Sequence, residues 1–198
     1  MSFIRAFIAI ELPPELQTAL GGLAAQFARR NIQAIRWVAA QNIHLTLHFL
    51  GDTAPEKLEE ISAALRPLIA TQEPFTFRVE GIGAFPNLHR PRVIWSGLQA
   101  PADLPALQLI IEQTVKQCGL PVEDREFSPH LTIGRVKKDA TLQEIQLVSA
   151  TLQEIKIGVL GTVQVESVTL YRSDLRPQGS LYTPLYRFPL KVNPHIAR

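Results

Sequence analysis

Short stretches in which apolar and polar residues alternate are separated, along this chain, by stretches with apolar residues at helical spacing. The alternating stretches, rich in β-branched and aromatic residues, predict strands, and the others predict amphipathic helices. We expect helices over Glu15–Arg30, Pro55–Thr71, Asp103–Cys118 and Thr141–Leu152. We expect strands over Arg5–Glu11, Ile35–Val38, Asn42–Gly51, Phe75–Ala84, Arg92–Leu98, Glu126–Val136 and Tyr182–Leu190, and one or two more within Ile155–Leu170.

The order of these elements predicts an α+β fold with mainly antiparallel sheets, because several strands are joined by short turns and others are separated by helices. Helix starts support the assignment: Thr141 and Glu144 have the spacing of a capping box. Neither common glycine-rich phosphate loop is present, which argues against a Rossmann or P-loop nucleotide site. With 198 residues, the chain fits a single domain over residues 1–198.

One four-residue motif occurs twice: His-Leu-Thr-Leu at residues 44–47 returns as His-Leu-Thr-Ile at residues 130–133. Both copies lie on expected strands, each after a helix and a loop and before a turn and another helix. The repeat therefore predicts two similar lobes, approximately residues 1–90 and 91–198, with interleaving of their elements left open.

The spacing inside each copy places its polar residues together. Side chains of a strand alternate between faces, so His44 shares a face with Thr46, and His130 shares a face with Thr132. An imidazole titrates near pH 6.5, so one histidine can accept a proton while the other donates one. Hydroxyl groups can hold phosphoryl oxygens as negative charge develops. The pattern predicts acid–base chemistry on a phosphodiester; the alternative is two half-buried His-x-Thr pairs without a chemical task.

Metal binding is the rival use of these histidines. His44 and His48 are four residues apart, which suits zinc on a helix. On a strand, four residues span about 13 Å, which is too far for two ligands of one ion. We therefore expect no metal. Strict alternation puts His48 on the face of His44, where a secondary role is open, but a structural role is the better expectation.

Charge and composition narrow the setting. The formal net charge of +2 suits a phosphate-bearing partner without requiring one. The single cysteine, Cys118, excludes an intramolecular disulfide and is expected to be a buried structural thiol. The apolar run near the N-terminus is short and ends at Glu11, and no stretch reaches about 18 apolar residues. We expect a cytoplasmic protein without a membrane segment.

These residues resemble the 2H phosphoesterase superfamily, named for its paired His-x-Thr-x motifs, and within it the bacterial and archaeal RNA 2',3'-cyclic phosphodiesterases, also described as 2'-5' RNA ligases. The likeness runs over nearly the whole chain. Besides the two motifs, it rests on Arg5–Ile10 with the following prolines, Arg36–Val38, Phe85-Pro86, Arg90–Trp95, Phe127–Arg135 and Leu170–Ser173 with Gly179 and Tyr182.

The resemblance implies a bilobal α+β fold with pseudo-two-fold symmetry and a central groove between the lobes. It implies hydrolysis of an RNA 2',3'-cyclic phosphate to a 2'-phosphate without metal or nucleotide cofactor. By position, His44 would protonate the departing 3' oxygen, His130 would activate water, and Thr46 and Thr132 would bind the phosphate. Arg135 matches an arginine of the family that helps to hold the phosphate. Strict alternation would put Arg135 on the face opposite His130, and an ordinary surface arginine is the alternative.

Other functions stay open at this point. Small cyclic nucleotides or oligoadenylates are alternative substrates, because the loops around the groove set substrate choice. A non-catalytic RNA-end-binding module would explain the basic charge but leaves both His-x-Thr pairs without a role. Ligation of a 5'-hydroxyl RNA end would be the reverse reaction and secondary. We expect a monomer whose partner is an RNA with a cyclic phosphate end.

Overall fold

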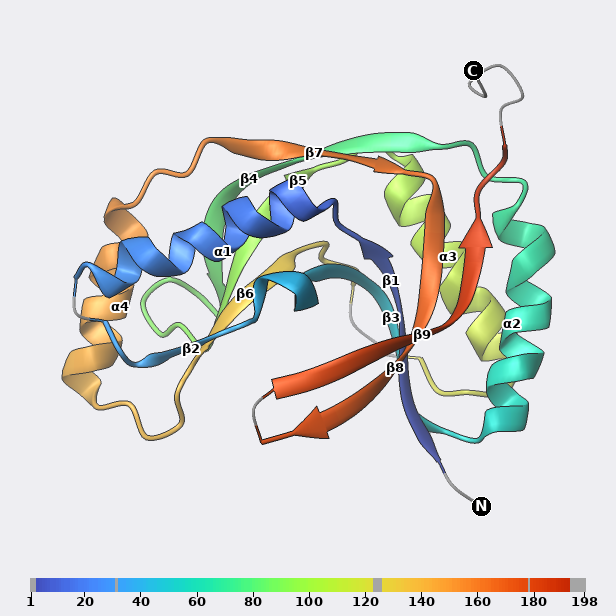
Figure 1. Cartoon of the computed structure of the whole chain (residues 1–198), viewed down its shortest axis with the longest axis horizontal. Helices are drawn as coiled ribbons and strands as arrows, with labels where there is room; N and C mark the ends of the chain where they lie inside the picture. The colour runs from blue at the N-terminus through green and yellow to red at the C-terminus, as the bar shows by residue number, and fades with distance from the viewer. Residues whose placement is uncertain (1–2, 31, 123–125, 178, 193–198) are drawn as a thin grey trace.

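The computed structural model describes residues 3–30, 32–122, 126–177 and 179–192, which form an α+β fold with the helices packed around a curled sheet (Figure 1). The helices are α1 (Pro14–Ala28), α2 (Pro55–Ile69), α3 (Asp103–Gln117) and α4 (Leu142–Glu154). The strands are β1 (Ile4–Glu11), β2 (Ile35–Trp37), β3 (His44–Thr53), β4 (Phe75–Phe85), β5 (Val93–Gln99), β6 (Leu131–Val136), β7 (Val159–Val165), β8 (Ser167–Arg176) and β9 (Gly179–Pro189).

The strands form one sheet in the order β7-β4-β5-β6-β3-β1-β8-β9, with β2 paired to β6. Every recorded pair is antiparallel, which confirms the expected fold class. We call β3, β1, β8 and β9 the β3 half, and β6, β5, β4, β7 and β2 the β6 half. Each half contains strands from both residues 1–90 and residues 91–198, so the two expected lobes interleave.

The helices cover one face of the sheet, which we call the helix face. In Figure 1, α2 and α3 flank the β3 half, and α1 and α4 flank the β6 half. Helix α2 begins at Pro55, whose missing N–H is tolerated in a first turn, and buries a stripe with helical spacing: Leu58, Ile61, Leu65 and Ile69. A buried leucine or isoleucine contributes about 1.5–3 kcal/mol. This apolar packing fixes the sheet that carries the site.

Two details inside the helices match the sequence. The capping box at α4 is present, because the Glu144 backbone N–H donates to Thr141 Oγ1 at 3.2 Å and the Thr141 N–H donates to Glu144 Oε2 at 2.8 Å. Cys118, which follows α3, is buried as expected, and this burial raises the pKa of its thiol. No helix among the described residues is long and apolar enough to cross a membrane.

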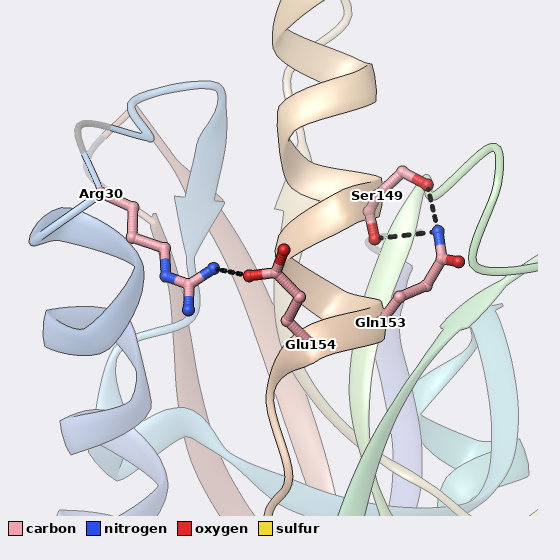
Figure 2. A network of polar contacts seen from close by, with 4 residues as sticks. All are labelled: Arg30, Ser149, Gln153 and Glu154. Atoms are coloured by element: carbon pink, nitrogen blue, oxygen red, sulfur yellow. Dashed lines mark hydrogen bonds and ion pairs between the residues drawn. The ribbon is translucent and has the colours of Figure 1, made fainter.

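A polar contact joins the ends of α1 and α4 on the β6 half. Arg30 donates to Glu154 Oε2 at 2.5 Å, while Gln153 on the same helix donates to Ser149 Oγ at 3.1 Å (Figure 2). An exposed ion pair of this kind contributes about 0–1 kcal/mol. The contact therefore adds little to the stability of the fold.

Two expected boundaries were wrong. The strand expected from Glu126 begins only at Leu131, because Pro129 has no backbone N–H for a ladder. The last strand, expected from Tyr182, begins at Gly179 and pairs with a β8 that extends to Arg176. Because the residues near Arg176 are polar, the hydrophobic pattern alone does not predict this longer hairpin.

Candidate active site

The two His-x-Thr motifs lie side by side where β3 meets β6. The strands pair antiparallel with Leu45 opposite Leu131, and both leucines are fully buried on the helix face. Continuing this register by one residue in each direction puts His44 opposite Thr132 and Thr46 opposite His130. Opposite residues of an antiparallel pair point to the same side with Cβ atoms about 4.5–5.5 Å apart. The four polar side chains therefore form two neighbouring cross-strand pairs, His44 with Thr132 and Thr46 with His130, which we call the His–Thr rungs. Both rungs lie on the other face of the sheet, which we call the site face.

Both histidines are held in the same way. His44 Nδ1 lies 2.8 Å from the carbonyl oxygen of Asn42, and His130 Nδ1 lies 2.7 Å from that of Ser128. A carbonyl oxygen only accepts, so each Nδ1 carries the hydrogen and donates it. In the neutral ring, Nε2 is then the basic nitrogen, and in the protonated ring it is an acid. Each ring can thus exchange its working proton at Nε2.

Aromatic rings surround His44. Phe7 of β1 stacks on it at 4.7 Å between ring centroids, and Tyr182 of β9 meets it edge-on at 5.2 Å. Phe7 also stacks on Tyr171 of β8 at 5.4 Å. Burial among these rings lowers the pKa of His44, and the hydrogen bond to the Asn42 carbonyl opposes that shift. The free protein therefore favours the neutral form of His44 at neutral pH.

His130 has a smaller aromatic neighbourhood on the β6 half. The ring of Phe85, at the end of β4, meets it edge-on at 4.8 Å. Phe85 in turn lies 5.4 Å from Trp95 of β5, between ring centroids. Trp95 lies over Gly83, where a Cβ atom would approach the indole to 2.2 Å. A side chain at position 83 would therefore displace the Trp95 ring from the wall beside His130.

A register shift in β6 brings Arg135 onto the site face. Trp95 pairs with Thr132, but Ile94 pairs with Gly134, so Ile133 is skipped. Such a bulge changes which face the following residues occupy. Val93, two residues before Trp95 and on its face, pairs with Arg135. The expectation from strict alternation was wrong, and Arg135 lies exposed on the same face as Thr132.

A second register shift removes His48 from the site. Ala9 pairs with Thr46, but Ile8 pairs with His48, so Leu47 is skipped. His48 therefore shares the helix face with the buried Ile8, is 7% exposed, and does not lie beside His44 as strict alternation suggested. Among the described residues, no group of three or more His, Cys, Asp or Glu side chains is placed to hold a metal ion.

Reasoning from the sequence missed several residues that shape the site. Asn42 supplies the carbonyl that holds His44, and its side-chain Nδ2 donates to the Ser180 carbonyl of β9 at 2.7 Å. Nothing in the sequence marks this bond, because it joins segments 138 residues apart. Phe7, Tyr182 and Phe85 lie in segments that carry the family resemblance, which is the signal that could have found them.

Comparisons with known proteins agree with this arrangement. The family model described as LigT like Phosphoesterase matches residues 10–95 and 98–182. The RNA 2',3'-cyclic phosphodiesterase of Methanothermobacter thermautotrophicus is 32% identical over 187 residues, covering 94% of this chain and 99% of that protein. That of Archaeoglobus fulgidus is 30% identical over 186 residues, covering 93% of this chain and 99% of that protein.

Solved structures show the same fold. Escherichia coli LigT in its apo form superposes with a TM-score of 0.76 at 30% identity, covering 97% of this chain and 100% of that one. The same protein complexed with phosphate gives a TM-score of 0.74 at 28% identity, covering 97% and 100%. The family model and these relatives cover nearly the whole chain, including both His-x-Thr motifs. The chain therefore belongs to the LigT-like phosphoesterase family, whose curated relatives named above are RNA 2',3'-cyclic phosphodiesterases.

Proposed function

We propose that this protein opens the 2',3'-cyclic phosphate at RNA 3' ends to a 2'-phosphate, with His44 and His130 as the acid–base pair. The observation that carries the proposal is the pair of His–Thr rungs, in which both rings donate through Nδ1 to a carbonyl and keep Nε2 for catalysis. The names of the curated relatives support RNA ends as the substrate.

The chemistry needs one neutral and one protonated ring. Neutral His130 takes a proton from water through Nε2 as the water oxygen bonds to phosphorus. Protonated His44 gives its Nε2 proton to the 3' oxygen as the bond between phosphorus and that oxygen breaks. Thr46 and Thr132 donate hydrogen bonds to phosphoryl oxygens, and Arg135 neutralises their charge. No metal, nucleotide cofactor or covalent intermediate enters these steps.

The acid role of His44 couples its proton to the substrate. Burial lowers the pKa of His44 in the free protein. A phosphodiester anion bound beside the ring favours the charged form and raises that pKa. His44 therefore takes up its proton as the cyclic phosphate binds. A 5'-hydroxyl RNA end in place of water would open the cyclic phosphate with the two histidines in the same roles and give a 2'-5' link; the histidines exchange roles when the 3'-hydroxyl attacks that link and restores the cyclic phosphate.

The remaining parts of the proposal concern setting and range. We propose a monomer that works in the cytoplasm. Small cyclic nucleotides and oligoadenylates are the alternative substrates, since each carries a phosphodiester that the two rungs can hold. A non-catalytic RNA-end-binding module is disfavoured, because simple binding gives no reason for two histidines held with Nε2 available for proton transfer.

The test is hydrolysis of an RNA oligomer ending in a 2',3'-cyclic phosphate, in excess EDTA, from pH 5 to 9. Wild type should show a bell-shaped pH profile and leave the phosphate on the 2' oxygen. His44→Ala and His130→Ala should each lose at least ~100-fold in rate. His89→Ala, an exposed histidine in the loop after β4, is the matched control. Activity that EDTA abolishes, or active His44 and His130 variants, would overturn the proposal.

A further inference from the structure

A third rung continues the two His–Thr rungs along β6. Strand β2 pairs with β6 along the same edge as β3, a few residues further along β6. Its register puts Arg36 opposite Arg135. Going along β6, the rungs are therefore Thr46 with His130, His44 with Thr132, and Arg36 with Arg135.

Neighbouring contacts fix the face of this third rung. Trp37, next to Arg36, pairs with Gly134 and packs on Phe27 of α1 at 5.1 Å between ring centroids. A Cβ atom at Gly134 would lie 3.0 Å from the Trp37 ring, so both point to the helix face. Arg36 and Arg135 therefore point the other way, to the site face, in agreement with the pairing of Arg135 with Val93.

The two arginines form a cationic pair that the described residues leave without a carboxylate partner. Both side chains are exposed, and neither is part of a salt bridge among the described residues. Like charges directly opposite in a sheet are destabilising. An anion between or beside the two guanidinium groups removes that cost, and their planar donor geometry suits phosphate.

The spacing along β6 indicates which phosphate group of a substrate each arginine can reach. Thr132 and Arg135 are three residues apart, at most about 10 Å along a strand, and the bulge at Ile133 shortens that path. The long side chain of Arg135 can reach back to the phosphate held at Thr132. Arg36 lies opposite Arg135 on another strand, so its guanidinium is left for a second negative charge, such as that of the phosphodiester one nucleotide away.

We propose that Arg36 binds the phosphodiester that precedes the terminal cyclic phosphate of an RNA strand, while Arg135 binds the terminal phosphate itself. The inference rests on the proposed function and adds a second phosphate subsite to the same face. A mononucleotide lacks this preceding phosphodiester. The subsite therefore makes the protein prefer an oligonucleotide end to a free cyclic nucleotide, which is the choice that the His–Thr rungs leave open.

The test compares the binding of two product molecules, a nucleoside 2'-monophosphate and a dinucleotide ending in a 2'-phosphate, at several salt concentrations. Wild type should bind the dinucleotide about 10-fold more tightly. Arg36→Ala should bring this ratio close to one and reduce the salt slope for the dinucleotide by ~0.7. Arg36→Lys should recover part of both. Arg29→Ala, which removes one exposed charge beside the end of α1, is the matched control and should behave as wild type.

Comparing binding with hydrolysis separates this inference from the proposed function. Equal affinities of wild type for the two molecules, or a ratio that Arg36→Ala leaves unchanged, would overturn the second subsite. Failure of wild type to hydrolyse a cyclic-phosphate dinucleotide would instead contradict the proposed function, and the affinity ratio would still decide whether Arg36 binds the second phosphate.

Discussion

At the scale of single residues, the ring of His44 shows how packing sets chemistry. The Asn42 carbonyl fixes its tautomer, and the rings of Phe7 and Tyr182 exclude water from it. The hydrogen bond favours the charged ring and burial favours the neutral one, and burial has the larger effect, so the pKa of His44 is lowered. A histidine with a lowered pKa is neutral in the free protein and can accept a proton. It becomes a proton donor when a neighbouring anion raises its pKa.

The lowered pKa also links stability to pH. In the unfolded chain His44 titrates near pH 6.5. In the folded protein its pKa is lower, so below about pH 6.5 the unfolded state binds more protons and the free energy of unfolding decreases as pH falls. Urea unfolding at pH 7.5 and 5.5 should show a smaller decrease for His44→Asn than for wild type. His89→Asn should keep the wild-type decrease, and equal decreases in all three proteins would contradict the assignment.

At the scale of elements, the β8–β9 hairpin and the turn before β3 act on His44 together. Asn42 holds the ring through its carbonyl and holds β9 through its amide at Ser180, two residues before Tyr182. Among the described residues, this hairpin joins the rest of the sheet where β8 pairs with β1. The bond from Asn42 therefore closes the hairpin against the site face at the point where Tyr182 covers His44.

Asn42→Ala tests this tether, because it removes the amide but leaves the carbonyl that holds the ring. Losing one hydrogen bond should lower the free energy of unfolding by ~1 kcal/mol. As β9 loosens, water should reach His44 and raise its pKa toward the ordinary value, which an NMR titration of the ring would detect. Gln41→Ala, an exposed neighbour in the same turn, is the control. An unchanged titration in Asn42→Ala would show that the tether does not act on His44.

Elements were predictable where the pattern is local, and the faces of the strands were not. Helical periodicity and the capping pair located α2 and α4 to within a few residues. The repeated motif also identified the four residues of the two rungs. Strict alternation failed at Leu47 and Ile133, where one residue is skipped. A bulge depends on the partner strand, which lies far away in sequence, so the faces of His48 and Arg135 became visible only in the folded sheet.

At the scale of the whole molecule, the chain passes repeatedly between the two halves of the sheet. It runs from β1 to β2, back to β3, across to β4 and β5, and later from β7 to β8, so neither half is a continuous segment. The halves meet where β3 and β6 pair, and the His–Thr rungs lie at that meeting. The proposed acid and base therefore come from different halves, and their separation depends on how the two halves are joined.

This crossing pattern predicts that residues 1–198 unfold as one cooperative domain. The two tryptophans, Trp37 in β2 and Trp95 in β5, both lie in the β6 half, so their fluorescence reports that half alone. Far-UV circular dichroism reports helices and strands of both halves. In a urea titration the two signals should change together with the same midpoint, as two-state unfolding requires. A fluorescence transition that precedes or follows the dichroism transition would show that the halves unfold independently and that the site can open along its β3–β6 join.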